Sequence, residues 1–180
     1  MPESPSIRGE YQQHGVHKFY EQQGATYRNP HEEAIREALR LAVARWKLDP
    51  AGKVLDLACG SGEATLLLRE LGFQHIDGVD PYTGAAYRER TGQPAEAFTF
   101  EQIAVGALEG RTYDLIVCSF ALHLAAESRL PTLAYQLSQI ASLLLILTPH
   151  KRPYLKAEWG WVLDDEFVHD RVRCRLYRKR

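Results

Sequence analysis

The stretch Val54-Leu55-Asp56-Leu57-Ala58-Cys59-Gly60-Ser61-Gly62-Glu63 decides the fold of this chain. Its first half is an apolar run typical of a buried strand, and its second half is a loop of small residues that opens a helix. A backbone that turns sharply and approaches a ligand closely has little room for side chains, so Gly60 and Gly62 suit such a loop. A glycine pair alone is a weak signal, and its value depends on the residues that follow.

Asp80 strengthens this signal because it ends the next expected strand, His75 to Asp80, twenty residues after Gly60. An acidic side chain at this place can accept hydrogen bonds from both hydroxyls of a ribose. Glu101 comes after a third expected strand, Ala97 to Phe100. The ligands of doubly wound sheets bind at the carboxyl ends of the strands, so we expect the glycine loop, Asp80 and Glu101 to converge there.

Short apolar runs alternate with helical stretches along the rest of the chain. Further strands are expected over Tyr113 to Ser119 and Leu143 to Thr148, and helices over Glu63 to Leu71, Thr83 to Arg90 and Ser128 to Ala141. This alternation predicts an α/β fold with a doubly wound, mostly parallel sheet that is covered by helices on both faces.

The last residues follow a different pattern, in which apolar side chains alternate with basic ones. Val172, Cys174 and Leu176 lie between Arg171, Arg173, Arg175 and Tyr177, which predicts a strand with one buried and one exposed face. Trp161 to His169 is expected to form another strand before it, with a turn near Asp164-Asp165 or His169-Asp170.

The amino-terminal 30 residues are polar and rich in glutamine, with few helix signals before Asn29. Asn29 can cap a helix, Pro30 suits the first helical position, and Glu32 lies three residues after the cap, as in a capping box. Apolar residues then recur at helical spacing, so we expect an amphipathic helix that ends near Lys47.

Together these residues resemble the class I S-adenosylmethionine-dependent methyltransferases over roughly residues 31–180. Val54 to Gly62 resembles the first motif of that family, although Ala58 stands where glycine is commoner. Gly78-Val79-Asp80-Pro81 resembles the second motif, and Phe100-Glu101-Gln102-Ile103 lies where the family places an acidic residue near the adenine. The resemblance implies a Rossmann-like fold that ends in an antiparallel strand.

The resemblance also implies the cofactor S-adenosyl-L-methionine and a set of residues that bind it. These residues are Asp56, Ala58, Cys59, Gly60, Gly62, Asp80, Pro81, Tyr82, Glu101, Gln102, Ile103 and Ser119. A nicotinamide-binding domain is the sharper rival, because it too uses a glycine loop and an acid on the ribose. That rival requires a third glycine, whereas Glu63-Ala64-Thr65 follows Gly62 here, so methyl transfer is favoured.

The segment Tyr20 to His31 precedes the first strong helix, and in this fold such a segment commonly folds over the donor as a lid. We expect Tyr27 and Arg28 to line the cofactor site, with Arg28 pairing the carboxylate of the donor or an acidic substrate. Tyr20 and His31 are candidate substrate contacts. The alternative is an arm that packs on the surface without a role in binding.

Two clusters near the expected strand ends are candidates for the acceptor side. His123 follows the fourth strand and is the nearest titratable side chain that could act as a base, although it could equally form only local hydrogen bonds. His150, Lys151 and Arg152 follow the fifth strand and could bind a carboxylate or a phosphate. The alternative is a solvated connector stiffened by prolines.

Length and charge restrict the partners of this chain. Its 180 residues, 45% of them apolar, suit a single domain (1–180) with an amino-terminal arm (1–30) and a core (31–180). Residues 171–180 hold six of the 22 basic residues and no acid, so the other 170 residues carry 16 bases against 23 acids. An acidic body disfavours broad binding to nucleic acid and favours a small-molecule acceptor.

Other acceptors stay open at this point. RNA or protein could dock on the arginine-rich last strand, and a non-catalytic protein that only binds the donor is a third possibility. The three cysteines are widely spaced, which predicts neither a disulfide framework nor a metal site. No apolar run is long enough for a bilayer and no signal-peptide pattern opens the sequence, so we expect a cytoplasmic protein without membrane partners. The oligomeric state is left open.

Overall fold

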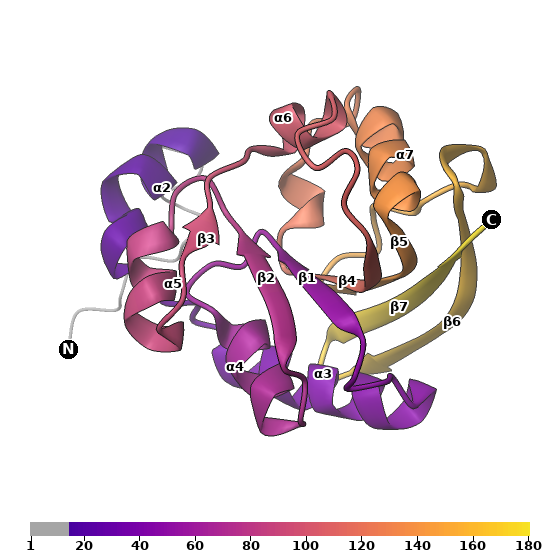
Figure 1. Ribbon diagram of the computed structural model, residues 1–180, viewed down its shortest axis with the longest axis horizontal. Helices are drawn as coiled ribbons and strands as arrows, with labels where there is room; N and C mark the ends of the chain where they lie inside the picture. The colour runs from indigo at the N-terminus through magenta and orange to yellow at the C-terminus, as the bar shows by residue number, and fades with distance from the viewer. Residues whose placement is uncertain (1–14) are drawn as a thin grey trace.

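The computed structural model describes residues 15–180 and contains a seven-stranded sheet in the order β3-β2-β1-β4-β5-β7-β6 (Figure 1). β1 pairs in parallel with β2 and β4, and β7 runs antiparallel to both of its neighbours, β5 and β6. The predicted α/β fold with a mostly parallel sheet and an antiparallel ending is therefore confirmed. The strands are β1 (Lys53–Leu57), β2 (His75–Val79), β3 (Ala95–Glu96), β4 (Tyr113–Ser119), β5 (Ala141–Thr148), β6 (Trp161–His169) and β7 (Val172–Lys179).

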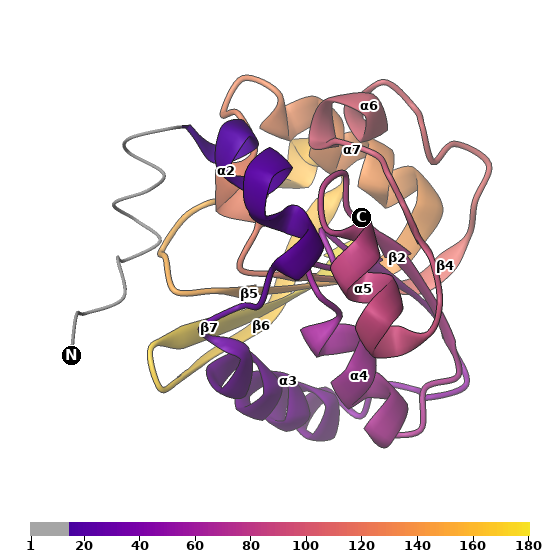
Figure 2. The ribbon, with the colours of Figure 1, turned by 90° about the vertical axis from the view of Figure 1, so that its left-hand side faces the viewer.

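Helices cover the sheet on both faces, as Figure 2 shows with the sheet nearly edge-on. α3 and α4 lie on one face, and α6 and α7 lie on the other. Each face has its own apolar core, because alternate side chains of a strand point to opposite faces. The helical elements are α2 (Val16–Gln23), η1 (Gly24–Thr26), α3 (Glu32–Trp46), α4 (Glu63–Glu70), α5 (Gly84–Thr91), α6 (Phe100–Ala104), η2 (Leu122–Leu124), α7 (Leu130–Ile140) and η3 (Ala157–Trp159).

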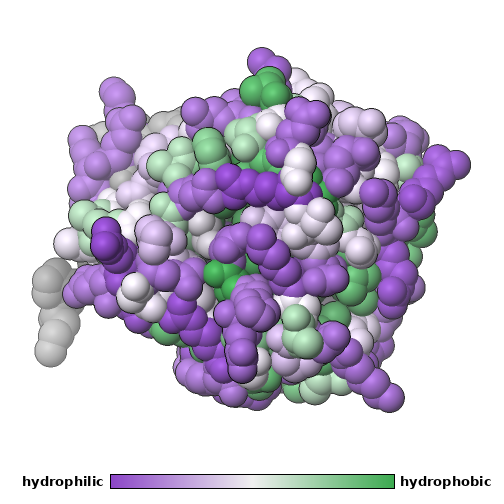
Figure 3. Space-filling view, in the orientation of Figure 1, coloured by the Kyte–Doolittle hydropathy of each residue, from purple (hydrophilic) through white to green (hydrophobic). Residues whose placement is uncertain are grey.

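The surface seen in Figure 3 is mostly polar, with apolar side chains confined to small patches. Within residues 15–180, the helices are all too short or too polar to cross a bilayer.

Two of the expected local structures are wrong. The third strand covers only Ala95–Glu96, because Thr99 caps α6 instead of extending the strand. Thr99 Oγ1 accepts a hydrogen bond from Gln102 N, and Gln102 Oε1 accepts one from Thr99 N, which completes a capping box. The expected capping box at Asn29 does not form. α3 begins at Glu32, and the Asn29 side chain instead accepts a bond from the His31 backbone.

The amino-terminal segment contains α2, which the sequence pattern did not predict. Its mean hydropathy is low, and it carries neither an acidic residue in its first turn nor a basic one in its last. The helix is followed directly by η1, where Gly24 is buried. Residues 1–14 of the predicted arm, and the side chain of Tyr20, lie outside the part of the chain that the structure describes.

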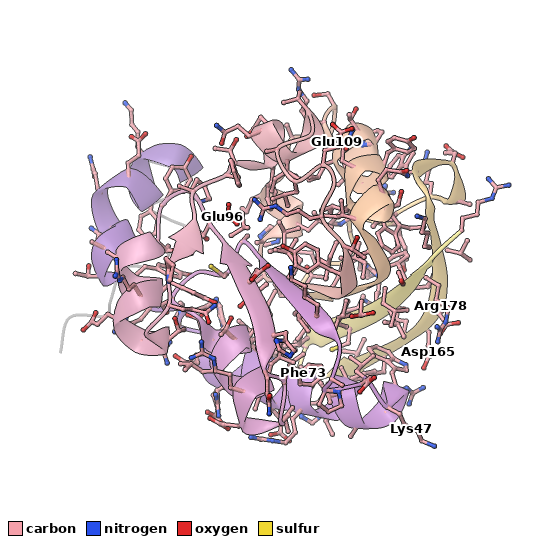
Figure 4. The ribbon with its side chains drawn as sticks, viewed as in Figure 1. Lys47, Phe73, Glu96, Glu109, Asp165 and Arg178 are labelled. Carbon is pink, nitrogen blue, oxygen red and sulfur yellow. The ribbon has the colours of Figure 1, made fainter. Side chains whose placement is uncertain are left out.

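The last strand is covered on both faces, which corrects the prediction of an exposed arginine face. Arg175 and Tyr177 are fully buried, because the segment between β5 and η3 packs over them. The turn between β6 and β7 falls at Asp170-Arg171, next to the second of the two places considered. Figure 4 labels Arg178 and Asp165 beside these two strands.

Acidic residues of β6 neutralise part of the basic ending. Glu166 pairs with Arg173 at 2.7 Å and with Arg175 at 2.6 Å, and Asp164 pairs with Arg178 at 2.9 Å. Asp165 instead accepts hydrogen bonds from Arg45 and Trp46 of α3.

Candidate active site

The glycine loop turns the chain from β1 into α4 through three left-handed backbone positions. Ala58, Gly60 and Gly62 have φ angles of +55°, +55° and +92°. A Cβ at Gly62 would lie 2.6 Å from Cγ2 of Thr91, so packing and backbone conformation both require glycine there. Ala58 is strained in this left-handed conformation, which glycine adopts without strain.

Asp80 holds the glycine loop and the start of the next segment with a single carboxylate. Its Oδ1 accepts hydrogen bonds from the backbone N–H groups of Tyr82 (2.9 Å) and Thr83 (3.0 Å). Its Oδ2 accepts one from Gly60 N at 3.2 Å. These bonds fix the carboxylate next to the glycine loop before any ligand binds, which lowers the cost of ordering it on binding.

A pocket opens at the carboxyl ends of β1, β2 and β4 and encloses about 900 Å³, its open mouth included. Nine predicted residues line it: Tyr27, Ala58, Gly60, Asp80, Pro81, Tyr82, Glu101, Ile103 and Ser119. The structure adds nine that lie outside the predicted set of site residues: Asn29, Leu57, Glu63, Phe98, Thr99, Phe100, Phe120, Ala121 and Leu124.

The lining is both aromatic and acidic. Five aromatic side chains and three carboxylates face the pocket, and no lysine or arginine lines it among the described residues. Aromatic faces can stack on a flat ring such as a purine, and carboxylates favour a cationic ligand. The pocket therefore suits a ligand that combines an aromatic base, hydroxyl groups and a positive charge.

Glu63 is the most informative residue that the sequence reading missed. It begins α4, is 3% exposed, and its Oε1 accepts hydrogen bonds from Ser61 Oγ (2.5 Å) and Asn29 N (3.3 Å). Arg90 of α5 lies 3.8 Å from the same oxygen and pairs with Glu32 at 2.6 Å. Glu63 thus joins the amino-terminal segment to the glycine loop. Its place directly after Gly62 was the one sequence signal.

Asp56 lies beneath the pocket instead of lining it. Its Oδ2 accepts hydrogen bonds from the backbone N–H (3.1 Å) and the hydroxyl (2.6 Å) of Thr65. Its Oδ1 is buried and has no hydrogen-bond partner among residues 15–180. Burial raises the pKa of Asp56 to about 8, despite the bonds from Thr65. Its observed contacts therefore anchor the first turn of α4.

The amino-terminal segment covers one side of the pocket. A Cβ at Gly24 would lie 2.1 Å from the backbone oxygen of Tyr82, so η1 rests directly on the residues that follow Asp80. Tyr27 lines the pocket, with its ring 3.3 Å from where a Cβ of Gly60 would lie. Arg28 does not line the pocket. It is exposed, lies 3.6 Å from Glu89, and donates to the carbonyl of Tyr27.

The remaining predicted cofactor residues do not face the cavity. Cys59, Gly62 and Gln102 do not line it. Cys59 is buried, its N–H donates to the carbonyl of Val79, and burial raises the pKa of its thiol well above the ordinary value. Gln102 completes the cap of α6.

Three of the predicted acceptor-side residues, His31, His123 and His150, gather near the loop after β4. The rings of His123 and His150 meet edge to face at a centroid distance of 4.5 Å. His31 stacks on Phe120 at 5.5 Å, and Phe120 lines the pocket. Lys151 and Arg152 are exposed on the loop that carries His150. The side chains of these four predicted residues (His31, His150, Lys151 and Arg152) and of His123 do not line the pocket itself.

His123 is the most perturbed titratable group of this cluster. It lies between Ala121 and Leu124, which both line the pocket. Burial, together with the nearby His150, lowers the pKa of His123 to about 4. Its Nδ1 is buried without a hydrogen-bond partner in the described part of the chain. The imidazole is therefore neutral at pH 7.

Comparison with known proteins places this geometry in context. Residues 27–177 match the family described as a methyltransferase domain. An uncharacterized protein of Schizosaccharomyces pombe is 34% identical and is matched over 97% of this chain and 92% of its own length.

Solved structures share the fold at low sequence identity. Magnesium protoporphyrin IX methyltransferase from Synechocystis, crystallised with bound S-adenosylmethionine, superposes with a TM-score of 0.62 at 16% identity and covers 100% of both chains. A TehB-like S-adenosylmethionine-dependent methyltransferase from Corynebacterium glutamicum has a TM-score of 0.62 at 17% identity, with 98% of this chain and 100% of that chain covered.

Proposed function

The chain belongs to the methyltransferase-domain family, and we propose that it transfers the methyl group of S-adenosylmethionine to a small-molecule acceptor. The observation that carries this proposal is the acidic, aromatic pocket at the strand ends, with the Asp80 carboxylate fixed beside the glycine loop. The donor fits this set of groups because it contains an adenine, a ribose with two hydroxyls, and a sulfonium cation.

The lining residues suggest how the donor would be held. Asp80 would accept hydrogen bonds from the ribose hydroxyls, and Glu101 and Ile103 would border the adenine with the neighbouring phenylalanines. Glu63 and Asn29 would face the amino-acid part. Glu63 would accept a hydrogen bond from the ammonium group of that part, whereas Arg28, expected to pair with its carboxylate, pairs with Glu89 outside the pocket.

The donor supplies a methyl group that is already activated by the positive sulfonium, so the protein mainly has to align the acceptor and exclude water. Tyr27, Tyr82 and Phe120 are placed to exclude water because they line the pocket from three separate segments. His123 is neutral at pH 7 and lies beside the pocket residues Ala121 and Leu124. It would accept the proton of an acceptor hydroxyl, thiol or amine as the methyl group is transferred.

A small acceptor is favoured by the state of the basic ending. Arg173, Arg175 and Arg178 form ion pairs with acids of β6, and Arg175 is buried. Arginines that are already paired contribute little to phosphate binding, so the last strand is a poor docking surface for RNA. An RNA or protein acceptor, and a non-catalytic protein that only binds the donor, are the alternatives.

A thermal-shift measurement tests the donor assignment. A ligand at about one hundred times its dissociation constant stabilises the folded state by roughly 2.7 kcal/mol. We expect S-adenosylmethionine and S-adenosylhomocysteine to raise the unfolding midpoint, and NAD to leave it unchanged at the same concentration. A shift with NAD alone would contradict the proposed function.

A further inference from the structure

The loop between β5 and η3 is held in place from beneath by one buried cation. Arg175 of β7 is fully buried and donates from Nη2 to the carbonyl of Lys151 (2.5 Å) and from Nη1 to that of Pro153 (3.1 Å). Its guanidinium carbon lies 3.9 Å from the centroid of the Tyr154 ring. Three of its contacts therefore fix the same short loop.

The fourth contact of Arg175 compensates its charge. Nε donates to Glu166 Oε2 at 2.6 Å, and Glu166 also accepts a bond from the more exposed Arg173 at 2.7 Å. Taking a guanidinium out of water is costly, and a well-packed apolar residue is often as stabilising as a buried ion pair. Stability alone therefore does not explain why an arginine occupies this position. The two N–H groups at the end of the guanidinium are spaced to reach both loop carbonyls, and this bonding requires the geometry of arginine.

The position of the loop determines what lies next to His123. With its backbone carbonyls bound to Arg175, the loop leaves the side chains of His150, Lys151 and Arg152 exposed. The backbone N–H of His150 donates to Thr148 Oγ1 at 3.1 Å, which fixes the start of the loop at the end of β5. The His150 ring then lies 4.5 Å from the His123 ring.

We propose that Arg175 is a positioning residue of the acceptor side: it holds the loop over residues 150–154 so that His150 packs against His123 beside the pocket. The term acceptor side rests on the proposed function, whereas the link from Arg175 through the loop to His123 does not.

The test measures the titration of the His123 imidazole by heteronuclear NMR, with no donor or acceptor present. The His123 signal is assigned from its loss in His123→Asn. In the wild type we expect a midpoint near pH 4, because burial and His150 both lower the pKa. Arg175→Met releases the loop, so the midpoint should rise toward 6.5, the ordinary value for histidine.

A matched control separates this effect from the loss of an ion pair. Arg173→Met also removes a bond to Glu166, but Arg173 has no hydrogen bond to the loop, so its His123 midpoint should stay near that of the wild type. Arg175→Lys keeps the charge but lacks the fork that reaches both loop carbonyls, so its midpoint should lie between those of the wild type and Arg175→Met. An unchanged midpoint in Arg175→Met, or an equal rise in Arg173→Met, would overturn the proposal.

A milder variant covers the case in which Arg175→Met does not fold. Tyr154→Ala removes the half-exposed ring from the guanidinium and leaves the buried ion pair in place. We expect a smaller rise in the same midpoint, and no rise would refute the role of the loop. Because no ligand is used, failure here and failure of the donor in the thermal-shift measurement are distinguishable.

Discussion

Asp80→Asn is the substitution with the most direct consequence for donor binding. The asparagine oxygen can keep the bonds from Tyr82 N and Thr83 N, which Oδ1 of Asp80 now accepts at 2.9 and 3.0 Å. The amide nitrogen then replaces Oδ2, so Gly60 N loses its acceptor and the ribose loses a charged one. The change removes charge and acceptor capacity while the shape of the side chain stays the same.

The expected magnitude follows from the bonds lost to the ligand. A hydrogen bond to a charged group contributes about 1.5–3 kcal/mol. Its loss raises the dissociation constant roughly 10- to 150-fold. Isothermal titration with S-adenosylhomocysteine measures this value directly. The folded state should survive, because two of the three backbone bonds remain.

Asp77→Asn is the matched control, since Asp77 lies three residues earlier on β2 and does not line the pocket. Its carboxylate accepts a bond from the hydroxyl of Tyr113 and pairs with Lys53. We expect its affinity for S-adenosylhomocysteine to equal that of the wild type. Wild-type affinity in Asp80→Asn, or an equal loss in both variants, would refute the assignment of Asp80 to the ribose.

Three further substitutions test the loop beneath the donor. Gly62→Ala places a Cβ 2.6 Å from Thr91 Cγ2 in a left-handed backbone conformation. Urea denaturation should therefore show a free energy of unfolding that is lower by about 2–5 kcal/mol. An unchanged midpoint would contradict this packing. Ala58→Gly relieves a left-handed strain of roughly 1–2 kcal/mol in the folded state. It also raises the conformational entropy of the unfolded chain, which lowers stability by about 0.4–1 kcal/mol. A small net gain in stability is therefore expected, and a clear loss would argue against the strain. Asp56 has a folded pKa raised to about 8, so the stability from its bound proton is present at low pH and is lost as pH rises from about 4 through 8. Asp56→Asn should remove that pH dependence of thermal unfolding, and an equally steep dependence in the variant would assign it to another group.

The parts of the fold that the sequence predicted well are those set by local pattern. Tyr113–Ser119 and Trp161–His169 form strands with the predicted bounds, because their apolar content and flanking turns specify a strand without help from distant residues. The expected strand at Ala97 to Phe100 failed because Thr99 and Gln102 form a capping box, a signal that was present but outweighed by the aromatic residues.

Burial of Arg175 could not be predicted from the strand pattern. Alternation predicted which side chains share a face, but the cover over that face comes from residues 151–155, which are distant along the chain. Arginine is also among the residues least often buried. Tyr154 and the loop carbonyls complete its environment, and nothing in the spacing of β7 indicates them.

The candidate site divides in the same way. Gly60 and Asp80 follow neighbouring strands, so the sheet itself brings them together, and their places could be predicted. Asn29 and Phe120 enter the pocket through the packing of separate segments, which no short motif encodes. Arg28 has a residue type that suits a carboxylate ligand and lies close to the pocket along the chain. Its side chain nevertheless pairs with Glu89 at the surface.

The most direct test of the central claim is transfer of a labelled methyl group. The protein is incubated with methyl-labelled S-adenosylmethionine and cell extract, and the products are separated by size, with Asp80→Asn as the control at low donor concentration. We predict that label accumulates in the small-molecule fraction with the wild type and is strongly reduced with the variant. Label in RNA or protein, or no transfer to any fraction by a protein that binds S-adenosylhomocysteine, would contradict the account.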